Sequence, residues 1–326
     1  MKLKVSTYTI TLIFTLIATI LLCVLRTMAL LLEFDSATSY YNHDAMLPSL
    51  YMWGAFIIIA INAALVVYMR RDLQSIKVTS ESSVIIFIAA LLGFIIFAGT
   101  LLDFFISGIE MTFLSQVALV LSIPAALYCL IGIALPIGNN SAEIVLSMLF
   151  IMWLFLTLIG IYFDITIEVN NPGKVLTLST LAVSLIFFIS EARYRVAEPR
   201  AWLFTLSGIT TVIFSGLYAL PNALLLIMKQ YPDSNISITR EMVILGIFAY
   251  TVARLFITAP SVGQPMEDEG LDNSMQYYDE ESEDDVYYDD ADNAGSTHND
   301  SYGTPQKRSA HRRLSEYDMY GSDDGR

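Results

Sequence analysis

Long apolar segments recur along the first 258 residues of the chain, and short polar segments separate them. A helix needs about 20 apolar residues to cross the hydrocarbon core of a bilayer. Lipid offers no partner to a free backbone N–H or C=O group, so only such helices are stable there. We therefore predict eight transmembrane helices, at 5–25, 47–69, 84–105, 113–137, 144–163, 175–189, 201–228 and 242–258.

The composition agrees with a membrane location, since 55% of the residues are hydrophobic against about 45–50% in an average soluble domain. The predicted fold class is all-α, a polytopic membrane helix bundle. The basic start with Lys2 and Lys4 is also found in secretory signals. The first apolar stretch, however, continues past Arg26 to Leu32 and has no small-residue cleavage site, so we expect an uncleaved first helix.

The orientation follows from the lysines and arginines of the short loops, which concentrate on the cytoplasmic side. Eight of them fall on one predicted side: Lys2, Lys4, Arg70, Arg71, Lys77, Arg193, Arg195 and Arg200. Four fall on the other: Arg26, Lys174, Lys229 and Arg240. We predict a multi-pass protein of the cell membrane with the N-terminus and, for an even helix number, the C-terminus in the cytoplasm.

Charge divides the chain into two parts. Residues 264–326 hold 5 Lys and Arg and 18 Asp and Glu, so they carry −13 of the net charge of −14. Such a segment cannot bury enough apolar surface to offset the entropy of ordering. We predict a helix bundle over 1–263 and a disordered, acidic, cytoplasmic tail over 264–326.

Two tyrosine pairs interrupt the acidic tail, ten residues apart: Tyr277 and Tyr278, then Tyr287 and Tyr288. Paired tyrosines among acids are typical of short recognition motifs and of phosphorylation sites. The tail therefore has two interpretations, a passive solvated arm or a segment that binds a cytoplasmic protein partner.

Glu191 and Arg254 are the deepest ionisable residues of the bundle. At 1.5 Å per residue, Arg254 lies roughly 18 Å from Met242 and Glu191 about 24 Å from Val175. By this count both residues lie toward the cytoplasmic ends of their helices, at a similar level in the bilayer. The two side chains could therefore pair across the sixth and eighth helices. The alternative is that Arg254 extends to the headgroups while Glu191 ends its helix.

Asp103 and Asp164 fall at helix ends on the predicted outer side, where many loop residues are acidic. Such carboxylates could line a vestibule that concentrates cations. The alternative is that they are ordinary polar loop residues.

Prolines mark two candidate helix breaks, Pro124 in the fourth segment and Pro221 with Asn222 in the seventh. Proline removes a backbone hydrogen bond, and broken helices form many transporter sites. Most such prolines only kink a helix.

Catalytic motifs are absent from the sequence: there is no Gly-rich phosphate loop, Gly-x-Ser-x-Gly, His-Glu-x-x-His or Cys-x-x-Cys. We expect no catalytic residue, metal, cofactor or nucleic-acid partner. The leading hypothesis is a non-enzymatic scaffold, sensor or accessory subunit. The alternatives are a transporter of small solutes or ions and, third, an intramembrane enzyme that uses carboxylates such as Glu143 and Glu191. The sequence does not indicate an oligomeric state.

Overall fold

The computed structural model describes residues 7–73, 82–107, 113–134, 141–196, 201–229 and 238–258. Within these ranges eight helices are long and apolar enough to cross a membrane. The predicted all-helical, multi-pass membrane bundle is therefore confirmed. The predicted tail over 264–326, including Tyr277, Tyr278, Tyr287 and Tyr288, lies outside the described residues, so its disorder stays a prediction.

The eight long helices are α1 (Thr7–Leu32), α2 (Leu47–Tyr68), α4 (Ser83–Ser107), α5 (Phe113–Leu130), α6 (Ser141–Phe163), α7 (Pro172–Val196), α8 (Ala201–Ile227) and α9 (Ile238–Thr258). Three small elements connect or extend them. An antiparallel pair of two-residue strands, β1 (Phe34–Asp35) and β2 (Tyr40–Tyr41), joins α1 to α2. The one-turn helix α3 (Arg70–Leu73) follows α2, and the 3₁₀ turn η1 (Gly132–Ala134) follows α5.

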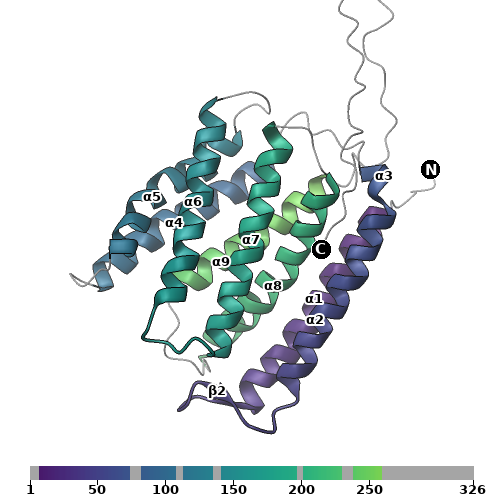
Figure 1. Cartoon of the computed structure of the whole chain (residues 1–326), viewed down its shortest axis with the longest axis vertical. Helices are drawn as coiled ribbons and strands as arrows, with labels where there is room; N and C mark the ends of the chain where they lie inside the picture. The colour runs from purple at the N-terminus through teal and green to yellow at the C-terminus, as the bar shows by residue number, and fades with distance from the viewer. Residues whose placement is uncertain are drawn as a thin grey trace, which may run out of the picture. The chain divides into compact units, whose positions relative to one another are not determined.

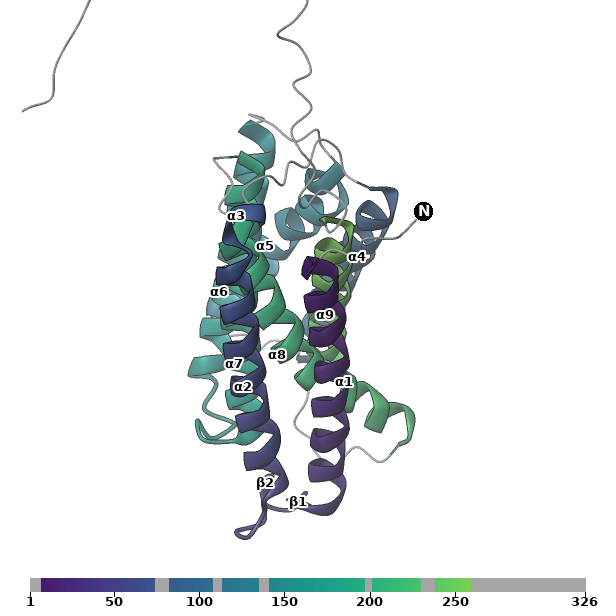
Figure 2. The ribbon, with the colours of Figure 1, turned by 90° about the vertical axis from the view of Figure 1, so that its right-hand side faces the viewer.

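Six of the helices form a closed ring. Each of α4, α5, α6, α7, α8 and α9 packs against its neighbours in that order, and α9 returns to α4. The other two, α1 and α2, pack on each other and on the side of the ring that α8 forms. Figure 1 shows this pair beside α8, with α4, α5 and α6 on the far side of α7 and α9. Figure 2, turned by 90°, shows α1 and α2 running side by side from β1 and β2.

Helix α8 is the most buried of the eight long helices. In its most apolar stretch 78% of the residues are buried, against 22% to 50% in the other seven helices. Its small residues allow this close packing, because a Cβ atom added to Gly216 would lie 2.6 Å from Cγ2 of Thr19 in α1. A helix buried on all sides is stable in this position only if its neighbours also satisfy its polar groups.

The outer helix faces carry the bilayer contacts. Large apolar side chains such as Trp53 of α2, Phe87 and Phe94 of α4 and Met148 of α6 are exposed. An exposed apolar surface of this extent is stable in lipid and unstable in water. The protein is therefore associated with a bilayer through several spanning helices.

Two helices continue seven residues past the C-terminal end of the apolar segments that predicted them. The sixth segment, 175–189, becomes α7 and continues to Val196. The first segment, 5–25, becomes α1 and continues past Arg26 to Leu32. In both extensions charged residues are buried among neighbouring helices, including Glu191, Arg195 and Arg26. A hydrophobicity criterion ends a helix at its first charge, whereas a partnered charge lets the helix continue.

Candidate functional site

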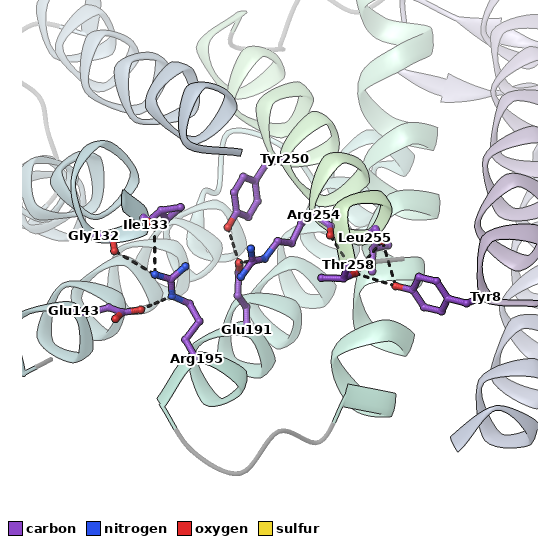
Figure 3. Close-up of polar contacts among 10 residues, drawn as sticks. All are labelled: Tyr8, Gly132, Ile133, Glu143, Glu191, Arg195, Tyr250, Arg254, Leu255 and Thr258. Atoms are coloured by element: carbon purple, nitrogen blue, oxygen red, sulfur yellow. Dashed lines mark hydrogen bonds and ion pairs between the residues drawn. The ribbon is translucent and has the colours of Figure 1, made fainter. Parts of the chain in front are cut away.

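Four charged side chains of alternating sign lie at the end of the bundle where α7 and α9 terminate. They are Glu143 of α6, Arg195 and Glu191 of α7, and Arg254 of α9, and Figure 3 shows them together. We call this set the ionic chain. Glu191 and Arg195 are four residues apart on α7, the spacing that brings side chains together on one helix face. All four are buried, with at most 4% of each residue exposed.

The first pair of the ionic chain joins α7 to α9. The Arg254 Nε atom lies 2.9 Å from Oε1 of Glu191. The Tyr250 hydroxyl, one turn before Arg254 on α9, donates to the same oxygen over 2.5 Å. The structure thus brings together the two residues that depth counting singled out. Both residues are buried among the helices, so Arg254 lies inside the bundle and not on its outer surface.

The second pair joins α6 to α7. The Arg195 Nε group donates to Oε1 of Glu143, and its Nη2 group donates to the carbonyl oxygens of Gly132 and Ile133, 3.4 Å away. Those two carbonyls belong to η1, so one guanidinium connects the end of α5, the start of α6 and the end of α7. The helix termini add to this, because Glu143 lies in the first turn of α6 and Arg195 in the last turn of α7. These are the positions where the helix dipole favours an anion and a cation.

Helix α1 joins the same end of the bundle through a hydroxyl group. The Tyr8 hydroxyl lies 3.3 Å from Oγ1 of Thr258 and donates to the carbonyl oxygen of Leu255 over 3.4 Å, as Figure 3 shows. This contact links the first turns of α1 to the last turn of α9. With the ionic chain, the polar contacts at this end join α1, α5, α6, α7 and α9.

A second polar cluster lies toward the opposite end of the bundle, on α8. Arg26 of α1 is 3% exposed, and its Nη1 group donates to the carbonyl oxygens of Leu217 and Tyr218. One turn further along α8, the Asn222 amide donates to both carboxylate oxygens of Glu241 in α9, over 3.0 and 3.1 Å. Sequence reasoning missed the role of Arg26, which counted only as a residue near a membrane interface. The signal that could have found it is Pro221, whose missing N–H leaves one carbonyl of α8 in need of a donor.

The two prolines lie inside continuous helices. Both α5 and α8 keep their helical form through Pro124 and Pro221. The backbone is therefore helical on both sides of each proline. What remains at Pro221 is the loss of one backbone hydrogen bond in the most buried helix, together with the buried Asn222 next to it.

Asp164 caps the loop after α6. Its Oδ1 atom accepts hydrogen bonds from the backbone N–H and the hydroxyl of Thr166, over 2.9 and 2.6 Å. The Lys174 ammonium donates to the carbonyl oxygens of Asp164 and Ile167. Asp103 lies in the last turns of α4, and its side chain is outside what the structure describes. A vestibule formed by these two residues therefore stays a prediction.

The Asp164 loop should loosen in acid. Partial burial raises the pKa of this carboxyl, but the Thr166 hydrogen bonds and the Lys174 charge outweigh burial and lower the pKa below its ordinary value. A carboxyl whose pKa is lower in the folded state stabilises that state at neutral pH and ceases to do so as pH falls through the lowered pKa. We expect hydrogen exchange at the Thr166 amide, corrected for intrinsic rate, to accelerate below about pH 4. D164N, which keeps an acceptor without a titrating charge, should remove this pH dependence, and an unchanged dependence in D164N would assign it to another group.

Among the described residues, no group of three or more His, Cys, Asp or Glu side chains is placed to hold a metal ion. Cys23 and Cys129 are buried and free, and the Cys23 thiol donates to the Gly216 carbonyl oxygen over 3.2 Å. The carboxylates Glu143 and Glu191 each lie beside an arginine of another helix. The arrangement of these charged side chains is thus suited to joining helices.

Comparisons with protein-family models, curated proteins and solved structures find no match for this chain.

Proposed function

We propose that this protein is a non-enzymatic membrane scaffold, sensor or accessory subunit, with a fixed helix bundle and an acidic C-terminal segment that binds a protein partner. The observation that carries the proposal is that two buried carboxylates of the bundle contact arginines of other helices. Glu143 and Glu191 each lie against an arginine from another helix, so these buried groups hold α6, α7 and α9 together. Ion pairs of this kind fix one arrangement of helices, which is a known use of buried charge.

The orientation of the chain is part of the proposal. The excess of lysine and arginine in one set of loops supports a location in the cell membrane with both termini in the cytoplasm. Residues 264–326 would then carry their charge of −13 into the cytoplasm. Protease added outside intact cells should spare an epitope placed after Arg326, and protease added to inverted vesicles should remove it. Cleavage in intact cells would overturn the proposed orientation.

Deletion of residues 264–326 tests the partner-binding role. Full-length protein, the deletion variant and a variant with a scrambled 264–326 sequence are cross-linked in native membranes, purified and analysed by quantitative mass spectrometry. We expect at least one protein to be recovered with the full-length chain and depleted from both variants, because recognition depends on sequence and not on charge alone. A third variant, with Tyr277, Tyr278, Tyr287 and Tyr288 changed to phenylalanine, isolates the hydroxyl groups.

The control for this experiment is the bundle itself. Because residues 7–258 contain the eight spanning helices, the deletion variant should insert and unfold in detergent as the full-length protein does. If the full-length chain, the deletion variant and the scrambled variant recover the same proteins while the bundle is intact, the partner-binding role is wrong.

A small-solute or ion transporter is the second candidate. The observation that favours it is Pro221 in α8, because a proline in the most buried helix, next to a buried Asn222, is a feature of transporter cores. Proteoliposomes with wild-type protein or E191Q can be tested for flux of H⁺, Na⁺ and K⁺. Flux in the wild type that E191Q abolishes would favour the transporter over the scaffold.

A further inference from the structure

Helix α8 lacks one backbone hydrogen bond at a defined place. In an α-helix the N–H of each residue donates to the carbonyl four residues earlier. Position 221 is proline and has no N–H, so the Leu217 carbonyl has no donor within the helix. A buried carbonyl without a donor costs about 1–3 kcal/mol when nothing replaces the bond.

Arg26 of α1 supplies the missing donor. Its Nη1 group donates to the Leu217 carbonyl and, over 2.8 Å, to the next carbonyl, that of Tyr218. The guanidinium also lies over the Tyr218 ring, 5.7 Å from its centroid. One turn earlier on α1, the Cys23 thiol contacts the Gly216 carbonyl. Two successive turns of α1 therefore donate to three successive carbonyls of α8 that precede the proline.

The segment after the proline has a separate tether. Asn222 donates to Glu241 in the first turn of α9, and Leu225 is buried, while Leu224, Leu226 and Ile227 are exposed. The polar contact between the last turns of α8 and α9 is thus one carboxylate, and the hydrogen-bond ladder that joins these turns to the rest of α8 is incomplete at Pro221.

We propose that residues 217–222 form a hinge in α8, which Arg26 restrains by taking the place of the Pro221 N–H group. The moving part is Pro221–Ile227, and Asn222 with Glu241 restrains it from the other side. Loss of the Arg26 bonds leaves the Leu217 carbonyl without a donor at the hinge, while the remainder of α8 stays packed against α7 and α9. This inference does not depend on the function proposed above.

The test restores the N–H group and asks whether Arg26 is still needed. Full-length protein in lipid nanodiscs is compared as wild type, R26M, P221A and P221A/R26M by hydrogen exchange of the amides of residues 222–228. We expect R26M to accelerate exchange there by roughly 10- to 100-fold, the equivalent of hydrogen bonds to a charged group. In the P221A background the same change should be about threefold or less, because this substitution restores an N–H group that donates to the Leu217 carbonyl.

N222A is the matched control. It removes the tether to Glu241 and replaces no helical bond, so its effect on exchange should be equal with and without P221A. Equal effects of R26M in the two backgrounds, or no effect in either, would overturn the proposal. If R26M alone is not recovered in folded form, recovery of P221A/R26M supports the hinge, and failure of the double variant as well overturns it.

Discussion

Replacing Glu191 with alanine is expected to destabilise the bundle by about 3–5 kcal/mol, the usual cost of removing one partner of a buried ion pair. Glu191 is fully buried, and both the Arg254 guanidinium and the Tyr250 hydroxyl lie against its Oε1 atom. E191A therefore leaves a buried guanidinium without this counter-ion and a buried phenol without this acceptor. The measurement is unfolding in mixed detergent micelles, followed by tryptophan fluorescence.

Three further variants separate charge from packing. E191Q keeps an acceptor for Tyr250 and should cost less than E191A. R254M removes the other partner and should cost about as much as E191A. The combination E191L/R254M/Y250F removes every member of the contact and should recover most of the loss, because apolar side chains of similar volume often replace a buried pair at little cost.

The matched control for this prediction is E168A. Glu168 is exposed in the loop after α6 and accepts a 2.6 Å hydrogen bond from Tyr40. Exposed polar pairs contribute about 0–1 kcal/mol because water screens them. If E191A costs no more than E168A, the Glu191 contact with Arg254 does not hold α7 against α9.

The positions of the helices could be predicted from the sequence because the bilayer imposes one simple requirement, about 20 apolar residues per span. The depth of Glu191 and Arg254 could also be predicted, since the helical rise converts residue numbers into distances. Their contact could not, because depth says nothing of the direction in which each side chain points. The ring of six helices, with α4 beside α9, depends on contacts between segments more than 100 residues apart.

Arg26 shows a different limit of the sequence. A single arginine near a helix end has the appearance of a residue that reaches for headgroups. Its burial follows from a deficiency elsewhere, the Leu217 carbonyl that Pro221 leaves without a helical donor. A proline inside a predicted helix indicates a carbonyl, four residues earlier, that needs a donor from elsewhere, and Arg26 is one residue that could supply it. Only the packing of α1 on α8 shows that Arg26 is the donor.

Arg193 and Arg195 pose the same problem more sharply, since both belong to one basic segment and both counted equally toward the predicted orientation. They lie in the same turn of α7, yet Arg193 is exposed and Arg195 is 4% exposed. The difference is one of helical phase. Two residues along a helix correspond to a rotation of about 200°, so the two side chains point to opposite faces. Only Arg195 faces Glu143 and the carbonyls of η1.

This contrast gives a prediction with an internal control. R195M is expected to cost about 3–5 kcal/mol of unfolding free energy, and R193M less than about 0.5 kcal/mol. The large cost arises because Glu143 is buried and its Oε2 atom has no hydrogen-bond partner among the described residues, so the carboxylate relies on Arg195 and on the start of α6.

R195K should fall between R195M and the wild type, since an ammonium keeps the charge and lacks the planar fork that reaches Glu143 and η1 together. E143L/R195M should recover most of the loss in unfolding free energy, as an apolar pair needs no counter-ion. Equal costs for R193M and R195M would show that the two arginines act alike, as headgroup anchors, and that the contact among α5, α6 and α7 is held by apolar packing alone.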